Sequence, residues 1–181
     1  MSARSVAVDE ALLERVLTPY FPQCRYLRSA EAVFGDDDGP PAVLRGELAI
    51  GSSCYIDDTG HFNSVEFNIC YNQLIYTLMA QCVVSGVTEP FAAMDLDEYL
   101  RRQLPDVLIH DFSSKFRQPM RIERFYGEVR IDEVRDRKRF VFVRTTVRFW
   151  DDHGGASEGA VSLAVVDRDA AEQTSRARSG S

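Results

Sequence analysis

Three polar residues, His61, Asn63 and Glu66, stand at the start of a long stretch that carries few charges. Histidine titrates near neutral pH and can act as a general base or acid. Asparagine carries an amide donor, and the first backbone N–H groups of a helix have no partner within that helix. Such donors can hold a carbonyl oxygen as negative charge develops on it. At the mouth of an apolar tunnel, this combination suits chemistry on acyl thioesters.

Each of the three residues also has a structural interpretation. A lone histidine is more often structural, although the adjoining Thr59-Gly60 turn favours a functional role for His61. Asn63 is a good helix N-cap. Glu66, one turn into the helix, can interact favourably with the helix N-terminus. It can equally serve as a base that activates water or deprotonates an amine, and we weigh the two roles evenly.

The sequence around these residues predicts one long helix and several strands. A short β-like stretch begins at Cys54, and the central helix runs over 63–84 and ends near Gly86. Shorter helices are predicted over 9–17, capped by Asp9, and over 95–104. Strands are predicted over 24–34, 43–50, 107–117, 125–133, 139–150 and 160–166, with turns at 35–41 and 151–155.

This order predicts an α+β architecture in which one central helix is wrapped by a curved antiparallel sheet. The strands over 24–34 and 43–50 would pair as a hairpin. An unpaired sheet edge would be exposed, which favours a dimer with a continuous sheet. A single domain is expected over residues 1–167, followed by a disordered tail over 168–181.

Composition excludes several classes of function. The 181 residues carry a net charge of −7, which argues against binding to nucleic acid. Asn72, Gln73 and Gln81 interrupt the longest apolar run, so no membrane span is predicted. The N-terminus is too polar for a signal peptide, and a cytoplasmic location is expected.

The chain has four cysteines and three histidines, none of them in a metal-binding pattern. No two cysteines form a C-x-x-C pair, so buried free thiols are expected. A cysteine nucleophile is weakly supported, since apolar neighbours raise the pKa of a thiol. No glycine-rich nucleotide loop and no G-x-S-x-G motif occurs, and no cofactor is expected.

Four segments carry a resemblance to a known family. They are LTPYFPQCRY, SCYIDDTGHFNSVEFNICYNQLIY, SSKFRQP and RFWDDHGGASEG, and they are spread over residues 17–159. In order and at matching spacing, they resemble the FcoT-like acyl thioesterases of actinobacteria. The resemblance implies a hotdog fold, which consists of one long helix wrapped by a curved antiparallel sheet, and a homodimer or larger assembly.

The resemblance also implies a set of site residues. The family site contains two tyrosines, one histidine and two asparagines, which fall here on Tyr20, Tyr55, His61, Asn63 and Asn72. The two asparagines are nine residues apart, on opposite sides of a regular helix. Either the helix begins after Asn63, or Asn72 faces a different wall of the site. In a hotdog dimer, the partner subunit would complete that site.

Two activities occur in this family, and the expected reaction here combines them. Some members hydrolyse long-chain acyl-CoA thioesters. Others, in the biosynthesis of isonitrile lipopeptides and β-amino-acid polyketides, add glycine to a 2-enoyl thioester on an acyl carrier protein. We expect glycine addition at the β-carbon followed by thioester hydrolysis, which gives a 3-(carboxymethylamino) fatty acid. The alternatives are a plain acyl-CoA or acyl-carrier-protein thioesterase, an enoyl hydratase and a non-catalytic acyl-binding dimer.

For the expected reaction, His61 and Glu66 would take the proton from the glycine amine. Tyr20, Tyr55 and Asn63 would polarise the thioester carbonyl, and Asn72 would orient the water or amine. The apolar helix residues Ile69, Leu74 and Leu78 would line the acyl tunnel or the dimer core.

Glycine addition further demands a cation for the glycine carboxylate, and arginine suits that task. The candidates are Arg25, Arg117 and Arg148. The basic segment 115–124, which begins with Lys115, could dock the phosphopantetheine phosphate or an acidic carrier protein. It could equally be a solvated strand edge. Lys115, Arg117, Arg148 and Gly60 are the expected substrate-binding residues.

Overall fold

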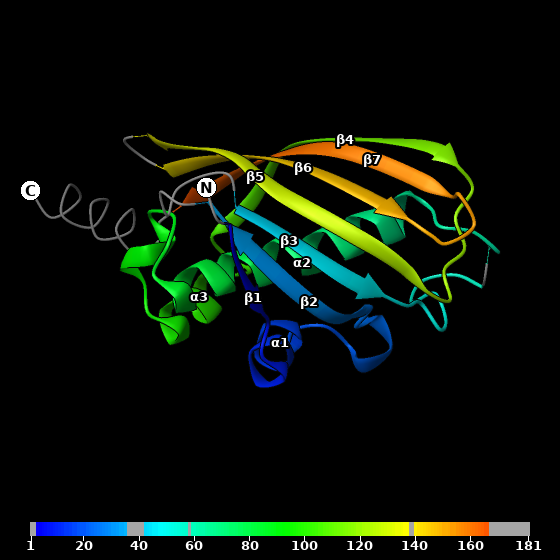
Figure 1. The fold of residues 1–181 in the computed structure, drawn as a ribbon, viewed down its shortest axis with the longest axis horizontal. Coiled ribbons are helices and arrows are strands. Elements are labelled where there is room, and N and C mark those ends of the chain that lie inside the picture. Colours follow the sequence, from blue (N-terminus) through cyan, green and yellow to red (C-terminus); the bar gives the residue numbers. More distant parts are fainter. Residues whose placement is uncertain (1–2, 36–41, 58, 138–139, 167–181) are drawn as a thin grey trace, which may run out of the picture.

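The computed structural model describes residues 3–35, 42–57, 59–137 and 140–166. Within these ranges the chain forms one antiparallel seven-stranded sheet in the order β1-β2-β3-β5-β6-β7-β4 (Figure 1). The predicted turn over 35–41 and the predicted tail lie largely or wholly outside the described residues. The strands are β1 (Arg4–Ala7), β2 (Leu27–Phe34), β3 (Ala42–Leu48), β4 (Val107–Gln118), β5 (Phe125–Arg137), β6 (Phe140–Trp150) and β7 (Ala156–Val166).

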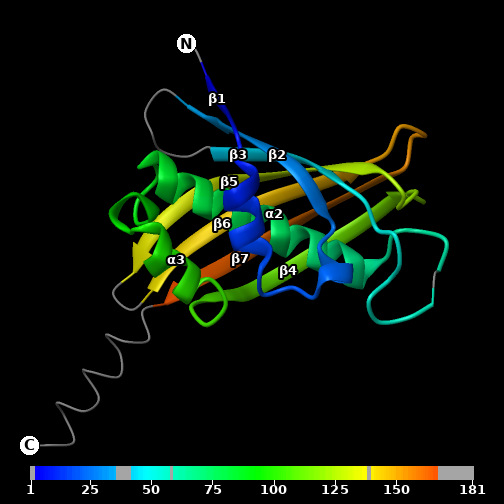
Figure 2. The same cartoon turned by 90° about the horizontal axis from the view of Figure 1, so that it is seen from below.

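The sheet curves around one long helix, α2 (Ser64–Ser85), as the sequence predicts (Figure 1). Two shorter helices, α1 (Glu10–Leu17) and α3 (Leu96–Arg102), contact α2, so that it is enclosed on most of its surface (Figure 2). Fifteen of its 22 residues are buried. A helix enclosed in this way explains its low content of charge.

Glycines on the strands let α2 lie close to the sheet. Gly46 of β3 pairs directly with Gly127 of β5. A Cβ at Gly46 would lie 3.1 Å from the Leu74 side chain, and one at Gly127 would lie 2.7 Å from it. A Cβ at Gly159 would lie 2.9 Å from the ring of Phe67. Leu74 and Phe67 therefore pack where side chains are missing from the sheet.

A buried glutamine connects α2 to the chain before β2. The side chain of Gln73 accepts hydrogen bonds from the backbone N–H groups of Tyr26 and Leu27, both at 2.9 Å. Its amide donates to the carbonyl of Cys24 at 2.6 Å. Because these backbone groups are satisfied by α2, the predicted strand over 24–34 begins only at Leu27, after a short 3₁₀ turn over Pro22–Cys24.

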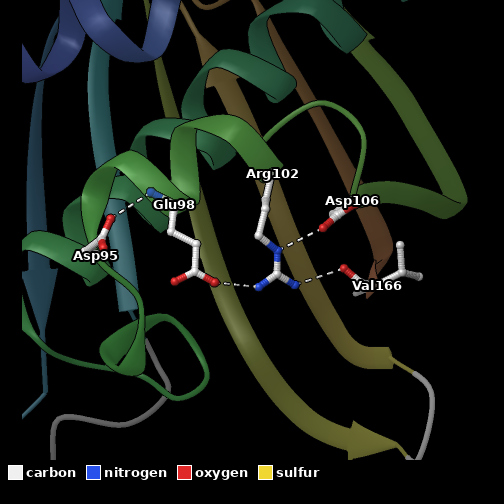
Figure 3. Close-up of polar contacts among 5 residues, drawn as sticks. All are labelled: Asp95, Glu98, Arg102, Asp106 and Val166. Atoms are coloured by element: carbon white, nitrogen blue, oxygen red, sulfur yellow. Dashed lines mark hydrogen bonds and ion pairs between the residues drawn. The ribbon is translucent and has the colours of Figure 1, made fainter. Parts of the chain in front are cut away.

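Arg102 holds α3 against the end of the sheet (Figure 3). Its guanidinium contacts Glu98 at 3.1 Å and Asp106 at 2.8 Å, and it donates to the carbonyl of Val166 at 3.1 Å. Asp106 immediately precedes β4, and Val166 ends β7. One planar guanidinium thus links the helix to two neighbouring strands.

The other predicted elements are largely confirmed. Asp9 caps α1 through a bond from the backbone N–H of Ala11, and Gly86 ends α2 in the left-handed conformation at φ 64°. β5 and β7 are longer than predicted, since β5 runs on to Arg137 and β7 starts at Ala156. β1 was not predicted, because its four residues show no distinct strand pattern in the sequence and depend on pairing with β2.

The short β-like stretch expected at Cys54 is wrong. Residues 51–57 form bends and pair with no strand among the described residues. The chain leaves the sheet after β3 and crosses to the start of α2. Residues 51–57 therefore do not run alongside a strand with which they could pair. This crossing segment carries most of the candidate site.

Candidate active site

The segment that crosses from β3 to α2 is fixed at both ends. The backbone N–H of Ile50 donates to the carbonyl of Ile122 at 2.8 Å, and that of Phe62 donates to the carbonyl of Met120 at 3.1 Å. Residues 120–122 thus form a short platform under the segment. The rings of Phe116, Phe125 and Phe149 surround Phe62, with centroids 5.1–6.4 Å from it. The segment therefore starts and ends at fixed points on the apolar core.

Asp151 anchors this platform from the neighbouring turn. Its carboxylate accepts hydrogen bonds from the backbone N–H groups of Arg121 at 2.7 Å, and of His153 and Gly155, both at 2.8 Å. Burial acts to raise the pKa of the Asp151 carboxyl, but these three donors outweigh it and hold the pKa below its usual value. A Cβ at Gly155 would lie 2.6 Å from the carboxylate, so only glycine fits there.

The depressed pKa of Asp151 gives a testable pH dependence. The ionised Asp151 carboxylate contributes to the free energy of unfolding. This contribution is fully present above the unfolded-state pKa of about 3.9 and is lost as the pH falls through the lower folded-state pKa. Asp151→Asn cannot accept all three bonds, and we expect it to lower stability by about 1–3 kcal/mol at pH 7. Urea unfolding at pH 7 and at pH 2–3 should show this difference shrinking in acid. A pH-independent difference would contradict the assignment.

Asn63 is the N-cap of α2, so the helix begins after Asn63, one of the two alternatives left open by the sequence. Its Oδ1 accepts from the backbone N–H groups of Val65 at 3.0 Å and Glu66 at 3.3 Å. The hydroxyl of Tyr55 also donates to Oδ1, at 2.9 Å. Three donors on one oxygen fix which way the amide points.

The other end of the same amide is left without a partner. Asn63 Nδ2 is buried and forms no hydrogen bond with the residues that the structure describes. A buried unsatisfied donor costs about 1–3 kcal/mol, so its retention at a helix N-terminus needs a reason. Held by Tyr55 and the helix, Nδ2 is a preorganised donor for a carbonyl oxygen.

Glu66 completes a capping box with Asn63. It is 1% exposed, and its carboxylate accepts from the backbone N–H of Asn63 at 3.4 Å. The structural role expected for Glu66 at the helix N-terminus is therefore present. Its negative charge adds to the effect of burial in raising the pKa of Cys70, one turn further along α2. Its catalytic role stays a prediction.

His61 is exposed and lies in the turn before α2. Its Nδ1 is 2.9 Å from the carbonyl oxygen of Thr59. Because a carbonyl only accepts, Nδ1 carries the proton in neutral imidazole, and Nε2 keeps the lone pair. The hydroxyl of Thr59 in turn donates to the carbonyl of His61 at 3.0 Å. Gly60 between them has φ 73°, which glycine adopts without strain.

Asn72 lies further along α2 than the other site residues, and Tyr20, from the segment before α2, lies beside the same part of the helix. Burial, together with the neighbouring Tyr76 and Cys70 of α2, raises the pKa of Tyr20. The amide of Asn72 donates to Asn68 Oδ1 at 2.8 Å. No hydrogen bond joins Tyr20 or Asn72 to Tyr55, His61 or Asn63 in the described part of the chain.

The apolar helix residues divide between two faces. Leu74 and Leu78 are fully buried against the core, whereas Ile69 is half-buried. Val65, Asn68 and Asn72 share this outward face with Ile69 and are also partly exposed. Of the three expected residues, only Ile69 is placed to meet a substrate or a partner subunit.

All four cysteines are free thiols, as expected, and Cys24, Cys70 and Cys82 are buried. Burial raises the pKa of Cys24 to about 11 and that of Cys82 to about 12. Thiols of this kind are poor nucleophiles at neutral pH. No group of His, Cys, Asp or Glu side chains in the described ranges is arranged to hold a metal ion.

The three expected cationic substrate residues lie on the outer face of the sheet, away from α2. Five directly paired residues alternate in charge across five strands: Arg45, Glu128, Arg148, Glu158 and Lys115. Arg148 contacts Glu128 at 3.0 Å, and Arg117 contacts Glu158 at 2.5 Å. Phe116, by contrast, turns inward to Phe62 and Phe67. Acidic residues of neighbouring strands thus pair with Arg117 and Arg148, and a role of the three cations with the glycine carboxylate stays a prediction.

The predicted docking of a phosphopantetheine phosphate or an acidic carrier protein at the basic segment 115–124 stays a prediction. A hollow of about 370 Å³ is lined by Ser113, Lys115, Thr146 and Arg148, among others. Arg25, the remaining candidate cation, is half-buried on the α2 side. Its guanidinium donates to the carbonyls of Tyr20 at 3.1 Å and Thr18 at 3.3 Å, so two backbone groups hold it.

Comparison with known proteins places this chain in a family. The FcoT-like thioesterase domain matches residues 15–165. The chain belongs to the FcoT-like thioesterase family. It is 46% identical over 164 residues to a (2E)-enoyl-ACP glycyltransferase of Streptomyces coeruleorubidus, with 88% of this chain and 98% of that protein covered. A protein of the same name from Mycobacterium bovis is 36% identical over 170 residues, with 92% and 91% covered.

A solved structure agrees on the fold of this FcoT-like protein. A hot-dog-like protein from Thermanaerovibrio acidaminovorans superposes with a TM-score of 0.51 at 14% identity, with 79% of this chain and 95% of that chain covered. The expected hotdog fold is therefore confirmed. None of the described helices is long and apolar enough to cross a membrane.

Sequence reasoning missed several residues around this FcoT-like site. The sequence contained a signal for the role of Gln73, because a glutamine inside an apolar helix must find buried hydrogen-bond partners. Asp151 also had one, since aspartate before His-Gly-Gly commonly accepts from the backbone of its own turn. Tyr26 and Ser53 had none, because only the fold brings Tyr26 beside the crossing segment that contains Ser53.

Proposed function

We propose that this protein adds glycine to the β-carbon of a (2E)-enoyl thioester on an acyl carrier protein and then hydrolyses the thioester. The buried Asn63 Nδ2, which has no partner among the described residues, carries the chemical part of the proposal. Glycine and the carrier protein come from the name shared by the curated relatives. The product would be a 3-(carboxymethylamino) fatty acid.

In the addition step, the thioester oxygen accepts from Asn63 Nδ2. The glycine nitrogen forms a bond to the β-carbon, and the electrons of the C=C bond move toward the thioester oxygen to give an enolate. His61 Nε2, with Glu66 as the second candidate base, takes the proton from nitrogen. Return of a proton to the α-carbon completes a secondary amine.

The hydrolysis step uses the same oxygen site. A water molecule, deprotonated by His61, adds to the thioester carbonyl, and the tetrahedral oxyanion is held by Asn63 Nδ2 and by the dipole of α2. The C–S bond then breaks, and the phosphopantetheine thiol leaves with a proton. One preorganised donor thus serves both an enolate and an oxyanion.

We further propose that two copies of the chain complete the site. β4 is an edge strand among the described strands. Its α2-facing side chains Ile109, Phe112 and Phe116 are partly exposed, the last at 45%. Phe112 and Phe116 of this apolar seam contact Phe67 of α2, β4 runs beside α2 (Figure 2), and Val65 and Ile69 on the outward face of the helix are also partly exposed. Pairing of two β4 edges would cover the seam and bring partner residues toward Asn72.

The dimer can be tested with matched variants of β4. Ile109→Asp places a charge in the apolar seam, and we expect light scattering to show a shift from about twice 20.5 kDa toward the monomer mass. Leu108→Asp, on the outer face of the same strand, should leave the dimer intact. A monomeric wild-type protein, or equal effects of both variants, would rule the arrangement out.

The activity itself is tested by mass spectrometry of the purified protein with a 2-enoyl thioester, with and without glycine. We expect a free acid that carries one added glycine. Release of only the unmodified enoic acid, at a rate independent of glycine, would identify an acyl thioesterase instead. A 3-hydroxy product would identify hydration.

A further inference from the structure

Tyr26 is enclosed beside the candidate site but takes no part in the mechanism given above. It lies between the 3₁₀ turn and β2, and it is 0% exposed. Its backbone N–H is held by Gln73 of α2 at 2.9 Å. The position of its ring is thus fixed by both the core and the helix.

The hydroxyl of Tyr26 has no hydrogen-bond partner among the described residues. The thiol and backbone N–H of Cys54 lie close to it, but neither is in hydrogen-bonding geometry. Two other fully buried tyrosines have partners for their hydroxyl groups: Tyr71 pairs with Thr145 at 2.9 Å, and Tyr99 donates to the carbonyl of Tyr76 at 2.8 Å. A fully buried orphan hydroxyl costs stability, and phenylalanine would avoid that cost.

A second buried hydroxyl without a partner in the described chain belongs to Ser53, the residue before Cys54. Cys54 in turn contacts Tyr26. Asn63 Nδ2 is a third unsatisfied donor among the described residues, and Oδ1 of the same amide accepts from the hydroxyl of Tyr55. Two of the three unsatisfied donors therefore belong to the crossing segment, and the third belongs to Tyr26, whose hydroxyl lies close to Cys54 of that segment. Such a grouping indicates a polar ligand that the protein is built to receive.

We propose that the hydroxyl groups of Tyr26 and Ser53 bind the carboxylate of the amino acid that attacks the enoyl thioester. This inference rests on the proposed function and names the binding group for its second substrate. A carboxylate only accepts hydrogen bonds, and both hydroxyl groups have a donor to give. Burial raises the pKa of Tyr26, so its phenol stays protonated and remains a donor at working pH.

The groups around Tyr26 could bind both ends of an amino acid, its carboxylate and its amine. Glu66 and Cys70 lie one turn apart on α2, and Cys54 is close enough to Cys70 to affect its pKa. The carboxylate of glycine would thus lie toward Tyr26 and Ser53, with the amine toward Glu66 and His61. Neutral donors at one end and bases at the other orient the amine toward the β-carbon.

Tyr26→Phe tests the inference, because it removes one oxygen atom and leaves the ring. We expect the KM for glycine to rise by about 10- to 100-fold, which corresponds to the loss of one bond to a charged group. The KM for the enoyl thioester and the rate of hydrolysis without glycine should stay within about twofold of wild type. The Tm should be unchanged or higher, because an orphan hydroxyl has been removed.

Tyr71→Phe is the matched control, because its hydroxyl is equally buried but is paired with Thr145. This variant should lower the Tm and leave the KM for glycine unchanged. Ser53→Ala gives a second, smaller rise in the KM for glycine and serves if Tyr26→Phe fails to fold.

Three outcomes would overturn the inference, and they can be told apart. An unchanged KM for glycine in both the Tyr26 and Ser53 variants would show that the hydroxyl groups do not bind the amino acid. An equal fall in glycine-independent hydrolysis would show that they hold the hydrolytic water. Absence of any glycine adduct with the wild-type protein would remove the proposed function, and the inference with it.

Discussion

Replacing His61 with alanine should lower both glycine addition and thioester cleavage by about 10²- to 10⁴-fold, the usual contribution of a general base. The reason lies in the hydrogen bond from Nδ1 to the carbonyl of Thr59, at 2.9 Å. This bond fixes the tautomer, so Nε2 presents its lone pair without a change of ring orientation. The rates are measured as product formation by mass spectrometry under single-turnover conditions.

His153→Ala is the control for this experiment. His153 is also exposed and lies in the turn after β6, where its ring contacts the side chain of Arg121 at 3.3 Å. The bond to Asp151 comes from its backbone, so the alanine variant keeps that anchor. We expect its activity to stay within about twofold of wild type. If His61→Ala retains more than a tenth of the activity, His61 is structural and Glu66 becomes the leading candidate for the base.

Replacing Asn63 with aspartate should lower activity by about 10²- to 10³-fold while the fold remains stable. Aspartate caps helices as well as asparagine does, and its oxygen can accept the same bonds from Val65, Glu66 and Tyr55. What disappears is the Nδ2 donor. The substitution thus removes the proposed oxyanion contact without removing the cap, and it adds a charge that opposes an oxyanion.

Asn63→Ala separates the two roles of this residue. It removes both the cap and the donor, so we expect a loss of stability of about 1 kcal/mol together with a loss of activity. Thermal unfolding and product formation are measured on all three proteins. An aspartate variant that is fully active would show that Nδ2 does not hold the thioester oxygen. One that is inactive because it is unfolded would show that the cap depends on the neutral amide.

The sequence alone determined the architecture and the position of the site along the chain. The spacing of apolar residues and the capping signals at Asn63 and Gly86 predict α2 to within a residue at either end, because both signals act over one or two turns. The resemblance in four segments indicated the family. Asn63, Tyr55 and Glu66 were identified as site candidates, and the structure joins them by hydrogen bonds.

The tertiary structure decided which side chains meet. Lys115, Arg117 and Arg148 are basic residues close to family motifs, but strand alternation places them on the outer face of the sheet, away from α2. Tyr26 and Ser53 lie 27 positions apart in the sequence, and no local pattern connects them. Tyr26 lies close to Cys54, the neighbour of Ser53, because Gln73 holds the chain before β2 against α2. Local signals therefore predict the elements, whereas contacts between distant segments decide which groups can share a substrate.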